Sequence, residues 1–273
     1  MSFKVVDARW LSDDVKRLEI QAPRVASHWL PGQFVIIRVD DNGERIPLTV
    51  CDVDTEKGTI VLIVQGIGKT TQMLNSKEAG EEIADVVGPL GHASEIEKFG
   101  TVVVIGGGVG TAIAYPTAKA LADAGNKVIA VIGARTADLL ILVDEMRRDV
   151  GEVVVVTDDG TAGKPGLVTD ALAEIMGKEK VDRVIAIGPI PMMRAVAELT
   201  RSDAIPTWVS LNPIMVDGTG MCGGCRVKIG EETRFACVDG PEFDAHLVDF
   251  NVLAMRNRAY ADFEKCRLQS LEK

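Results

Sequence analysis

Residues 101–110 read TVVVIGGGVG, and this stretch indicates the fold of the second half of the chain. Thr101–Ile105 is typical of a buried strand, the glycine run Gly106–Gly110 follows at once, and an alanine-rich stretch to about Ala124 predicts a helix. A strand, close glycines and a helix N-terminus form a cradle for a pyrophosphate, because backbone N–H groups and the helix dipole face the anion. The run is not GxGxxG, so a tight turn that binds no ligand stays the alternative.

Apolar runs and helical patterns alternate through the rest of this half. The predicted strands are Lys127–Ile132, Val153–Thr157, Val181–Ile187 and Pro206–Ser210. The predicted helices are Ala137–Arg147, Val168–Met176 and Met192–Thr200. This alternation predicts an α/β domain with a parallel sheet that is covered by helices on both faces.

The first hundred residues have the pattern of a β-domain. Short β-branched or alternating runs predict strands at Lys4–Ala8, Val15–Gln21, Gln33–Val39, Ile46–Val50, Thr59–Val64 and Glu82–Val87. Turn residues such as Pro31-Gly32 and Lys57-Gly58 separate them. Six short strands favour a small closed barrel, with one helix at about Thr70–Ser76.

The chain of 273 residues is long enough for two domains and a small appendage. We expect a barrel over residues 1–98, the α/β domain over 99–212, and a cysteine-rich module with a C-terminal helix (about Asp249 to Ser270) over 213–273. Thirty Lys and Arg against forty Asp and Glu give a net charge of −10, which argues against a nucleic-acid or anionic-membrane surface. No secretory signal or membrane-spanning stretch is evident, so we expect a cytoplasmic protein.

The strongest chemical signal is a cluster of thiols near the C-terminus. Residues 217–225 read DGTGMCGGC, and Cys237 follows after a predicted hairpin that returns it to Cys222 and Cys225. Glycines let the backbone wrap closely round a metal centre and point N–H groups at its sulfurs. Three thiolates need a fourth ligand, and Asp217 is the nearest anionic candidate.

An iron–sulfur cluster and a structural zinc knuckle both fit this spacing, and the iron–sulfur cluster is favoured. The odd number of cysteines, five, does not indicate a disulfide framework; Cys51 and Cys266 are isolated. None of the three histidines lies in a recognisable nucleophile–base arrangement, and there is no nucleophile elbow. Acid–base hydrolysis is therefore not expected.

Three further segments carry candidate phosphate contacts. Arg45 precedes Ile-Pro-Leu-Thr49 on a predicted barrel strand and has the fork geometry that suits a phosphate. Gly68–Thr71 leads into a short helix and can present backbone amides to the same group. Arg135 follows the second strand of the α/β domain, where it can contact an adenosine ribose or a 2′-phosphate. Each of these is also compatible with an ordinary surface residue.

Taken in this order, the motifs resemble those of the ferredoxin reductase superfamily across essentially the whole chain. The resemblance implies an FAD-binding barrel, a pyridine-nucleotide domain and a C-terminal 2Fe–2S module. It implies that FAD is held by Arg45, Pro47, Leu48, Thr49, Gly68, Lys69, Thr70 and Thr71. It implies that the nucleotide is held by Gly107, Gly108, Val109, Gly110, Thr111, Arg135, Gly188, Pro189 and Met192. It implies that the cluster is held by Asp217, Cys222, Cys225 and Cys237.

The order of the modules resembles the electron-transfer subunits of dihydroorotate dehydrogenase and, more closely, the small subunits of NADH-dependent reduced ferredoxin:NADP oxidoreductases. The stretches RIPLT, GIGKTT, VDGTGMCGGC and DGPEFDAHLVDF carry the closer match. The dihydroorotate type has a further cysteine where this chain has Asp217, which favours the ferredoxin:NADP branch and leaves the fourth ligand the least certain assignment.

The resemblance implies an electron-transfer subunit in which NAD(P)H, FAD and the cluster exchange electrons, with no catalytic side chain of its own. It implies electron bifurcation with a larger flavoprotein subunit that carries its own FAD and iron–sulfur clusters. NAD(H) is preferred on the resemblance, while Arg135 leaves NADP(H) open. The alternatives are the dihydroorotate dehydrogenase subunit and, from another class, a non-catalytic dinucleotide sensor with a structural zinc.

Overall fold

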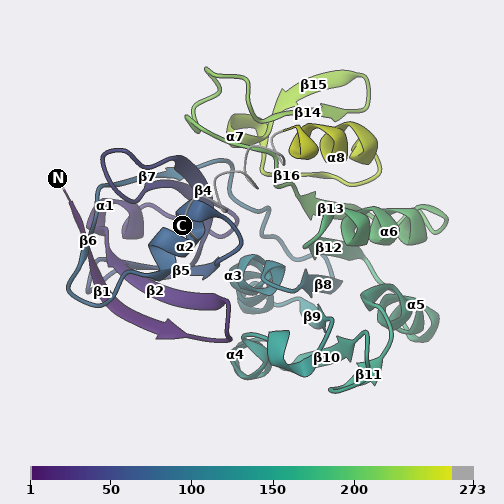
Figure 1. Ribbon diagram of the computed structural model, residues 1–273. Helices are drawn as coiled ribbons and strands as arrows, with labels where there is room; N and C mark the ends of the chain where they lie inside the picture. The colour runs from purple at the N-terminus through teal and green to yellow at the C-terminus, as the bar shows by residue number, and fades with distance from the viewer. Residues whose placement is uncertain (1, 260–273) are drawn as a thin grey trace. The chain divides into compact units, whose positions relative to one another are not determined.

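A computed structural model describes residues 2–259 of the chain. This part divides into two compact units, which Figure 1 shows in ribbon form. The first unit consists of residues 2–93, 212–241 and 249–259, and the second of residues 94–211 and 242–248. Cys266 and the part of the predicted C-terminal helix beyond residue 259 lie outside the described residues.

The N-terminal part of the first unit is a barrel-like sheet of seven strands. The strands are β1 (Phe3–Trp10), β2 (Val15–Gln21), β3 (Phe34–Arg38), β4 (Arg45–Asp54), β5 (Thr59–Gln65), β6 (Glu82–Ile83) and β7 (Asp85–Leu90). Their order in the sheet is β6-β1-β2-β5-β4-β3-β7. Because Ala84 alone separates the two edge strands β6 and β7 along the chain, the sheet curls until its edges meet at this residue.

The predicted barrel is confirmed, with one difference in its strands. The run predicted as a single sixth strand is divided into β6 and β7, since the backbone N–H of Ala84 donates to Val39 O and turns the chain from one edge to the other. The core inside the sheet is aliphatic and includes Leu18, Ile20 and Leu62, which are fully buried. Two helices cover it, α1 (Pro23–Ala26) and α2 (Lys69–Asn75); the sequence predicted only the second.

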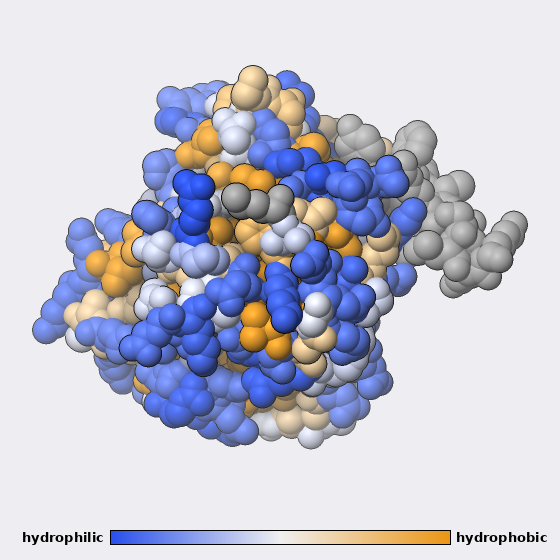
Figure 2. All heavy atoms as spheres, turned by 90° about the vertical axis from the view of Figure 1, so that its left-hand side faces the viewer, coloured by the Kyte–Doolittle hydropathy of each residue, from blue (hydrophilic) through white to orange (hydrophobic). Residues whose placement is uncertain are grey.

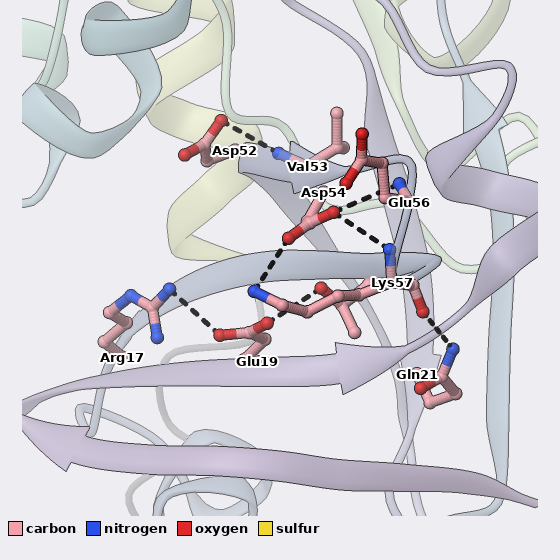
Figure 3. Close-up of polar contacts among 9 residues, drawn as sticks. Arg17, Glu19, Gln21, Asp52, Val53, Asp54, Glu56 and Lys57 are labelled. Atoms are coloured by element: carbon pink, nitrogen blue, oxygen red, sulfur yellow. Dashed lines mark hydrogen bonds and ion pairs between the residues drawn. The ribbon is translucent and has the colours of Figure 1, made fainter.

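Polar contacts fix the turn between β4 and β5 on the outside of the barrel (Figure 3). The Asp54 carboxylate accepts the backbone N–H groups of Glu56 and Lys57 and pairs with Lys57 Nζ at 2.8 Å. This hydrogen bond to the Lys57 side chain is the main reason that the pKa of Asp54 lies below its ordinary value. On the neighbouring strand, Glu19 accepts from Arg17 and Thr59. Local contacts therefore hold this hairpin, at the end of β4 opposite Arg45.

The C-terminal part of the first unit is small and loop-rich. It contains the predicted hairpin, formed by β14 (Arg226–Ile229) and β15 (Glu232–Phe235), and the short helix α7 (Ala236–Asp239). Helix α8 (Phe250–Arg258) starts at Asp249, whose carboxylate accepts the N–H groups of Asn251 and Val252 and so caps the helix.

The second unit is an α/β domain. Its strands are β8 (Thr101–Gly107), β9 (Lys127–Ala134), β10 (Glu152–Thr157), β11 (Lys164–Pro165), β12 (Arg183–Ile187), β13 (Thr207–Ser210) and β16 (Glu242–Asp244). Their order is β11-β10-β9-β8-β12-β13-β16. The first strand of the domain, β8, lies between β9 and β12 and runs parallel to both. The strand order therefore reverses at the carboxyl end of β8, where open α/β sheets bind ligands.

Helices cover both faces of this sheet, as predicted. They are α3 (Gly110–Asp123), α4 (Val143–Asp149), α5 (Val168–Lys178) and α6 (Ile190–Arg201). Helices α3 and α4 pack together on one face, and α5 and α6 pack together on the other (Figure 1).

Two predictions for this domain are wrong in detail. The helix predicted over Ala137–Arg147 is a 3-10 turn at Ala137–Leu139 followed by α4 from Val143, because Leu142 takes a left-handed conformation (φ 58°) that interrupts a helix. The sheet also ends in an antiparallel strand that the sequence did not predict: β16 pairs with β13 from a segment far along the chain.

No helix among residues 2–259 is long and apolar enough to cross a membrane. The face of the molecule in Figure 2 is mostly hydrophilic, and the hydrophobic residues on it lie in small separate groups.

Candidate functional site

The predicted nucleotide site lies at the carboxyl end of β8. The nucleotide loop (residues 106–111) joins β8 to α3, and Gly108 takes a left-handed conformation there (φ 55°) with open space where a side chain would project. The N–H groups of Thr111 and Ala112 donate to Gly108 O and Val109 O, so an anion at this loop would meet the N–H groups of Val109 and Gly110 that precede them. Thr111, in the first turn of α3, is fully buried, and its hydroxyl has no hydrogen-bond partner among the described residues. An unpaired buried hydroxyl beside these amides fits a polar ligand at this loop.

The structure brings the predicted Gly188 segment against the nucleotide loop. A Cβ atom on Gly110 would stand 2.4 Å from Ile187 O, at the end of β12. A Cβ atom on Gly107 would stand 2.4 Å from Met192 Sδ, in the first turn of α6. Both glycines are therefore required by close packing, and the predicted residues Gly188, Pro189 and Met192 lie beside the loop.

Arg135 lies apart from this contact, exposed at the end of β9. Its carbonyl accepts the backbone N–H of Asp159 at 3.3 Å, so the end of β9 adjoins the end of β10, where Asp158 and Asp159 follow the strand. No acid directly follows β9, where a dinucleotide fold holds the ribose. Asp158 and Asp159 directly follow the predicted strand that ends at Thr157, a signal that was not used in the sequence-based prediction.

In the barrel, the two predicted phosphate segments are neighbours. Arg45 is the first residue of β4, and Gly68 precedes α2. Thr70, near the start of α2, donates to the carboxylate of Glu44, the residue before Arg45. Thr71 closes the start of the helix, because its hydroxyl accepts Gly68 N–H and donates to Gly68 O.

The remaining predicted flavin residues follow Arg45 along β4. Pro47, Leu48 and Thr49 are all half-buried, although they belong to one continuous strand. Leu48 packs against the barrel core, whereas Arg45, Pro47 and Thr49 alternate onto the other face. A hollow of about 100 Å³ lies near this end of β4, lined by Glu44, Lys69 and Thr70 among others. Arg45 is not among the lining residues, and Lys69 shares the hollow with the acids Asp40 and Glu44. The candidate phosphate contacts are therefore Arg45 on the partly exposed face of β4 and the start of α2, rather than the hollow itself.

The four predicted cluster ligands lie in two pairs. Cys222 Sγ is 3.2 Å from Asp217 Oδ1, and Cys225 Sγ is 3.2 Å from Cys237 Sγ. The second distance is too long for a disulfide. Among residues 2–259, no three His, Cys, Asp or Glu side chains gather closely enough to hold a single metal ion. A zinc site needs four ligands around one ion, whereas each iron of a 2Fe–2S cluster takes two protein ligands. The paired arrangement therefore fits a two-iron cluster better than zinc.

The two pairs differ in environment. Cys222 is exposed, whereas Cys225 and Cys237 are almost fully buried. Burial, with the nearby Cys225 thiol, raises the pKa of Cys237 to about 12. Burial also acts to raise the pKa of Asp217, but hydrogen bonds from Cys222 and Thr219 outweigh it and hold this pKa well below its ordinary value. Asp217 is thus an anionic carboxylate next to a thiol that solvent can reach.

The cysteine loop (residues 216–225) packs directly on the barrel, which the sequence did not predict. Arg45 Nε donates to the carbonyl of Val216 at 2.8 Å, across 171 positions of sequence. Gly218 takes a left-handed conformation (φ 77°), and a Cβ atom there would stand 2.7 Å from Leu90 Cδ1 and 2.9 Å from Ile36 Cγ1. No sequence signal links these residues, because the contact depends on the folded unit alone.

A second hollow, of about 330 Å³, opens where the cysteine loop meets the end of β7. Its lining residues are Pro89, Leu90, Gly91, His92, Gly218, Thr219, Cys237 and Val238. Its volume lies at the lower end of the range for small-molecule sites. The hollow borders Cys237, so a group bound there would contact a predicted cluster ligand.

Comparisons with known proteins match both parts of the first unit. Residues 2–94 match the family described as "Oxidoreductase FAD-binding domain". Residues 212–249 match the family described as "Iron-sulfur cluster binding domain of dihydroorotate dehydrogenase B". The chain thus carries a flavin-binding domain and an iron–sulfur domain, as the sequence predicted.

Similar proteins extend over nearly the whole chain. A dihydroorotate dehydrogenase B (NAD(+)) electron transfer subunit homolog of Thermotoga maritima is 50% identical over 255 residues, which are 93% of this chain and 90% of that protein. The corresponding electron transfer subunit of Geobacillus thermodenitrificans is 35% identical over 250 residues, 88% of this chain and 95% of that protein. A solved structure of an NADH-dependent reduced ferredoxin-NADP oxidoreductase, studied for flavin-based electron bifurcation, covers 99% of this chain and 98% of its own, with a TM-score of 0.94 and 47% identity.

Proposed function

Because the chain belongs to the family of dihydroorotate dehydrogenase B electron transfer subunits and their homologues, we propose that it passes electrons between NAD(H), FAD and a 2Fe–2S cluster. We further propose that it does so within an electron-bifurcating reduced ferredoxin:NADP oxidoreductase complex. The pairing of Asp217 with Cys222 and of Cys225 with Cys237, beside the flavin domain, carries the proposal.

In this proposal the nucleotide loop binds the pyrophosphate of NAD(H). The backbone N–H groups of Val109 and Gly110 donate to it, and the hydroxyl of Thr111 gains the partner that it lacks. Gly110 lets the loop approach Ile187, so the pyrophosphate can lie close to the backbone. Gly188, Pro189 and Met192 line the same end of the sheet and orient the nicotinamide, while Arg135 lies where it can contact the adenosine.

The barrel residues hold FAD through its phosphates. Among residues 2–259, Arg45 uses its Nε for the contact with Val216, which leaves its two terminal nitrogens for a forked contact. Lys69 adds a second positive charge, and Gly68, Thr70 and Thr71 present the start of α2. When bound, FAD supplies the exchange between two-electron hydride chemistry and one-electron transfer.

The cysteine loop holds the cluster in two halves. Asp217 and Cys222 would hold one side of the cluster, and Cys225 and Cys237 would hold the other. Backbone N–H groups point at two of the sulfurs, from Gly224 to Cys222 Sγ at 3.4 Å and from Cys237 to Cys225 Sγ at 3.5 Å. Such N–H groups stabilise negative charge on the sulfurs and therefore favour the reduced cluster.

We propose that residues 1–98, 99–212 and 213–273 serve as the flavin, nucleotide and cluster domains, and that the protein works in the cytoplasm. The partner is a larger iron–sulfur flavoprotein subunit, with no nucleic acid or membrane involved. The relatives named as dihydroorotate dehydrogenase B subunits support a second candidate, in which the same electron path serves a dihydroorotate dehydrogenase. A zinc-bearing sensor is disfavoured because the ligands lie in pairs.

Anaerobic purification from the native cell tests this proposal. We expect one FAD and two irons per chain, no stoichiometric zinc, and co-purification with an iron–sulfur flavoprotein. A barrel-type dehydrogenase as partner would establish the second candidate. A colourless chain with one zinc would show that the proposed function is wrong.

A further inference from the structure

Arg45 makes a contact that holding a flavin phosphate does not require. Its Nε donates to Val216 O at 2.8 Å, and Val216 immediately precedes the proposed ligand Asp217. The planar guanidinium places the Nε donor and the two terminal nitrogens at fixed angles to one another. A phosphate bound by the terminal nitrogens therefore also fixes the direction in which Nε points.

We propose that Arg45 couples the two cofactor sites, so that FAD bound to the barrel holds the cysteine loop in the geometry that retains the cluster. This inference rests on the proposed function, because it takes Arg45 as a flavin phosphate ligand. Arg45 acts here as a positioning residue for the cluster: it reaches Asp217 through the Val216 backbone and touches no proposed metal ligand itself.

Besides the close packing of Gly218 on Leu90 and Ile36, the first half of the loop has little apolar support. Val216 is 47% exposed and Met221 89% exposed, so the first half of the loop buries little apolar surface. The second half is held from the other side, where Arg256 of α8 donates to Gly224 O at 3.1 Å. One arginine thus holds each end of the loop by a carbonyl, but Arg45 alone also belongs to the proposed flavin site.

Thermodynamic linkage requires the coupling between FAD and the cluster to act in both directions. If FAD slows the loss of the cluster by strengthening its binding, the cluster must raise the affinity for FAD by the same factor. Coupling free energies between sites correspond to about 5- to 150-fold in affinity. The variant Arg45→Lys distinguishes this coupling from a general stabilisation of the protein by FAD. A lysine keeps the positive charge but has a single nitrogen, which cannot bridge the phosphate and the carbonyl in the same way.

The test compares four proteins, each prepared anaerobically with and without FAD. They are the wild type, Arg45→Lys, Arg256→Lys and Lys69→Ala. The rate at which an excess of iron chelator bleaches the cluster is followed by visible absorbance. Arg256→Lys loosens the loop without touching the flavin site, and Lys69→Ala weakens the flavin site without touching the loop.

We expect saturating FAD to slow bleaching about fivefold or more in the wild type, Arg256→Lys and Lys69→Ala, and less than about twofold in Arg45→Lys. Removing the iron from the wild type lowers its FAD affinity, by the factor by which FAD raises the affinity for the cluster at equilibrium. If Arg45→Lys does not retain a cluster, amide hydrogen exchange of residues 214–222 is measured in the iron-free proteins. We then expect FAD to slow this exchange in the wild type but not in Arg45→Lys.

Equal protection by FAD in Arg45→Lys and the wild type, or none in the wild type, would overturn the coupling while leaving both cofactors in place. Failure of the proposed function would differ, since the protein would then lack FAD or iron altogether.

Discussion

The nucleotide loop and the cysteine loop are both glycine-rich turns, but they are built in different ways. The nucleotide loop is formed by consecutive residues between β8 and α3, and its amides come from the helix that it starts. The cysteine loop contains no helix or strand and takes its position from residues far away in sequence, including Arg45 and Arg256. A site of the first kind can be predicted from a short motif, whereas the second needs the folded unit.

The largest effect is expected at the cysteine loop, from Asp217→Ala. If Asp217 is the fourth ligand, this variant loses its cluster or holds it loosely, because Asp217 is the anion paired with Cys222. Iron content and visible absorbance measure the loss. Asp217→Cys is the matched control: it assembles a cluster with a lower potential, since thiolate stabilises ferric iron better than carboxylate does. Wild-type iron content and potential in Asp217→Ala would make Asp217 a turn residue only.

At the nucleotide loop, Gly110→Val tests whether local geometry alone makes the site. The new side chain meets Ile187 O, 2.4 Å from its Cβ position, so the loop must shift. Overpacking of this kind costs about 1–3 kcal/mol, and we expect NADH-driven flavin reduction to require at least about tenfold more NADH. FAD stays bound. Gly177→Ala, with open space around it in the same unit, serves as the control. Unchanged reduction in Gly110→Val would place the nucleotide elsewhere.

Arg45→Ala weakens FAD binding by about 1.5–3 kcal/mol, which is about 10- to 150-fold, because it removes a charged pyrophosphate contact. Flavin fluorescence during titration gives the affinity. Arg9, an exposed arginine of β1, provides the control variant Arg9→Ala, for which we expect no change. Full affinity in Arg45→Ala would remove this residue from the flavin site.

Gly218→Ala tests whether the cysteine loop depends on its contact with the barrel. The left-handed conformation costs alanine about 1–2 kcal/mol, and its Cβ atom forces Leu90 and Ile36 to move. Gly230→Ala has the same backbone cost (φ 57°) but lies in open space, at the turn between β14 and β15. We expect a lower melting temperature and faster cluster loss in Gly218→Ala than in Gly230→Ala. Equal values would mean that the loop does not depend on its contact with the barrel.

The smallest effect concerns the helix behind the nucleotide loop. Tyr115 of α3 donates to Asp149 of α4, and hydrogen bonds from Arg148 and Tyr115 lower the pKa of this carboxyl to about 2. A carboxyl whose pKa is lower in the folded state stabilises the fold above its ordinary pKa near 4 and loses that contribution as the pH falls to about 2. Asp149→Asn therefore lowers the melting temperature at pH 7 but not at pH 2. If the melting temperatures of wild type and Asp149→Asn differed by the same amount at pH 7 and pH 2, the ionised Asp149 carboxylate would not be the source of this stability.

The sequence predicted much of the fold and part of the site, and the reasons can be read from particular residues. The run Thr101–Ile105 is continuous and β-branched, so β8 was found with its loop and helix. The helix at Ala137 was wrong because one left-handed residue, Leu142, cannot be recognised from composition. Strand β16 has only three residues and forms because it pairs with β13, so its local sequence pattern does not predict it. Val216 was missed for the same reason, since its partner lies 171 positions away.

In the proposed electron path, flavin and cluster are successive carriers within this chain. Anaerobic reduction of the purified protein by NADH, followed by electron paramagnetic resonance and by flavin absorbance, detects both carriers in one experiment. We expect NADH to bleach the flavin, and the paramagnetic signal of a reduced 2Fe–2S cluster to appear in wild type but not in Asp217→Ala. A flavin that NADH reduces while no cluster signal appears in iron-loaded wild type would contradict it.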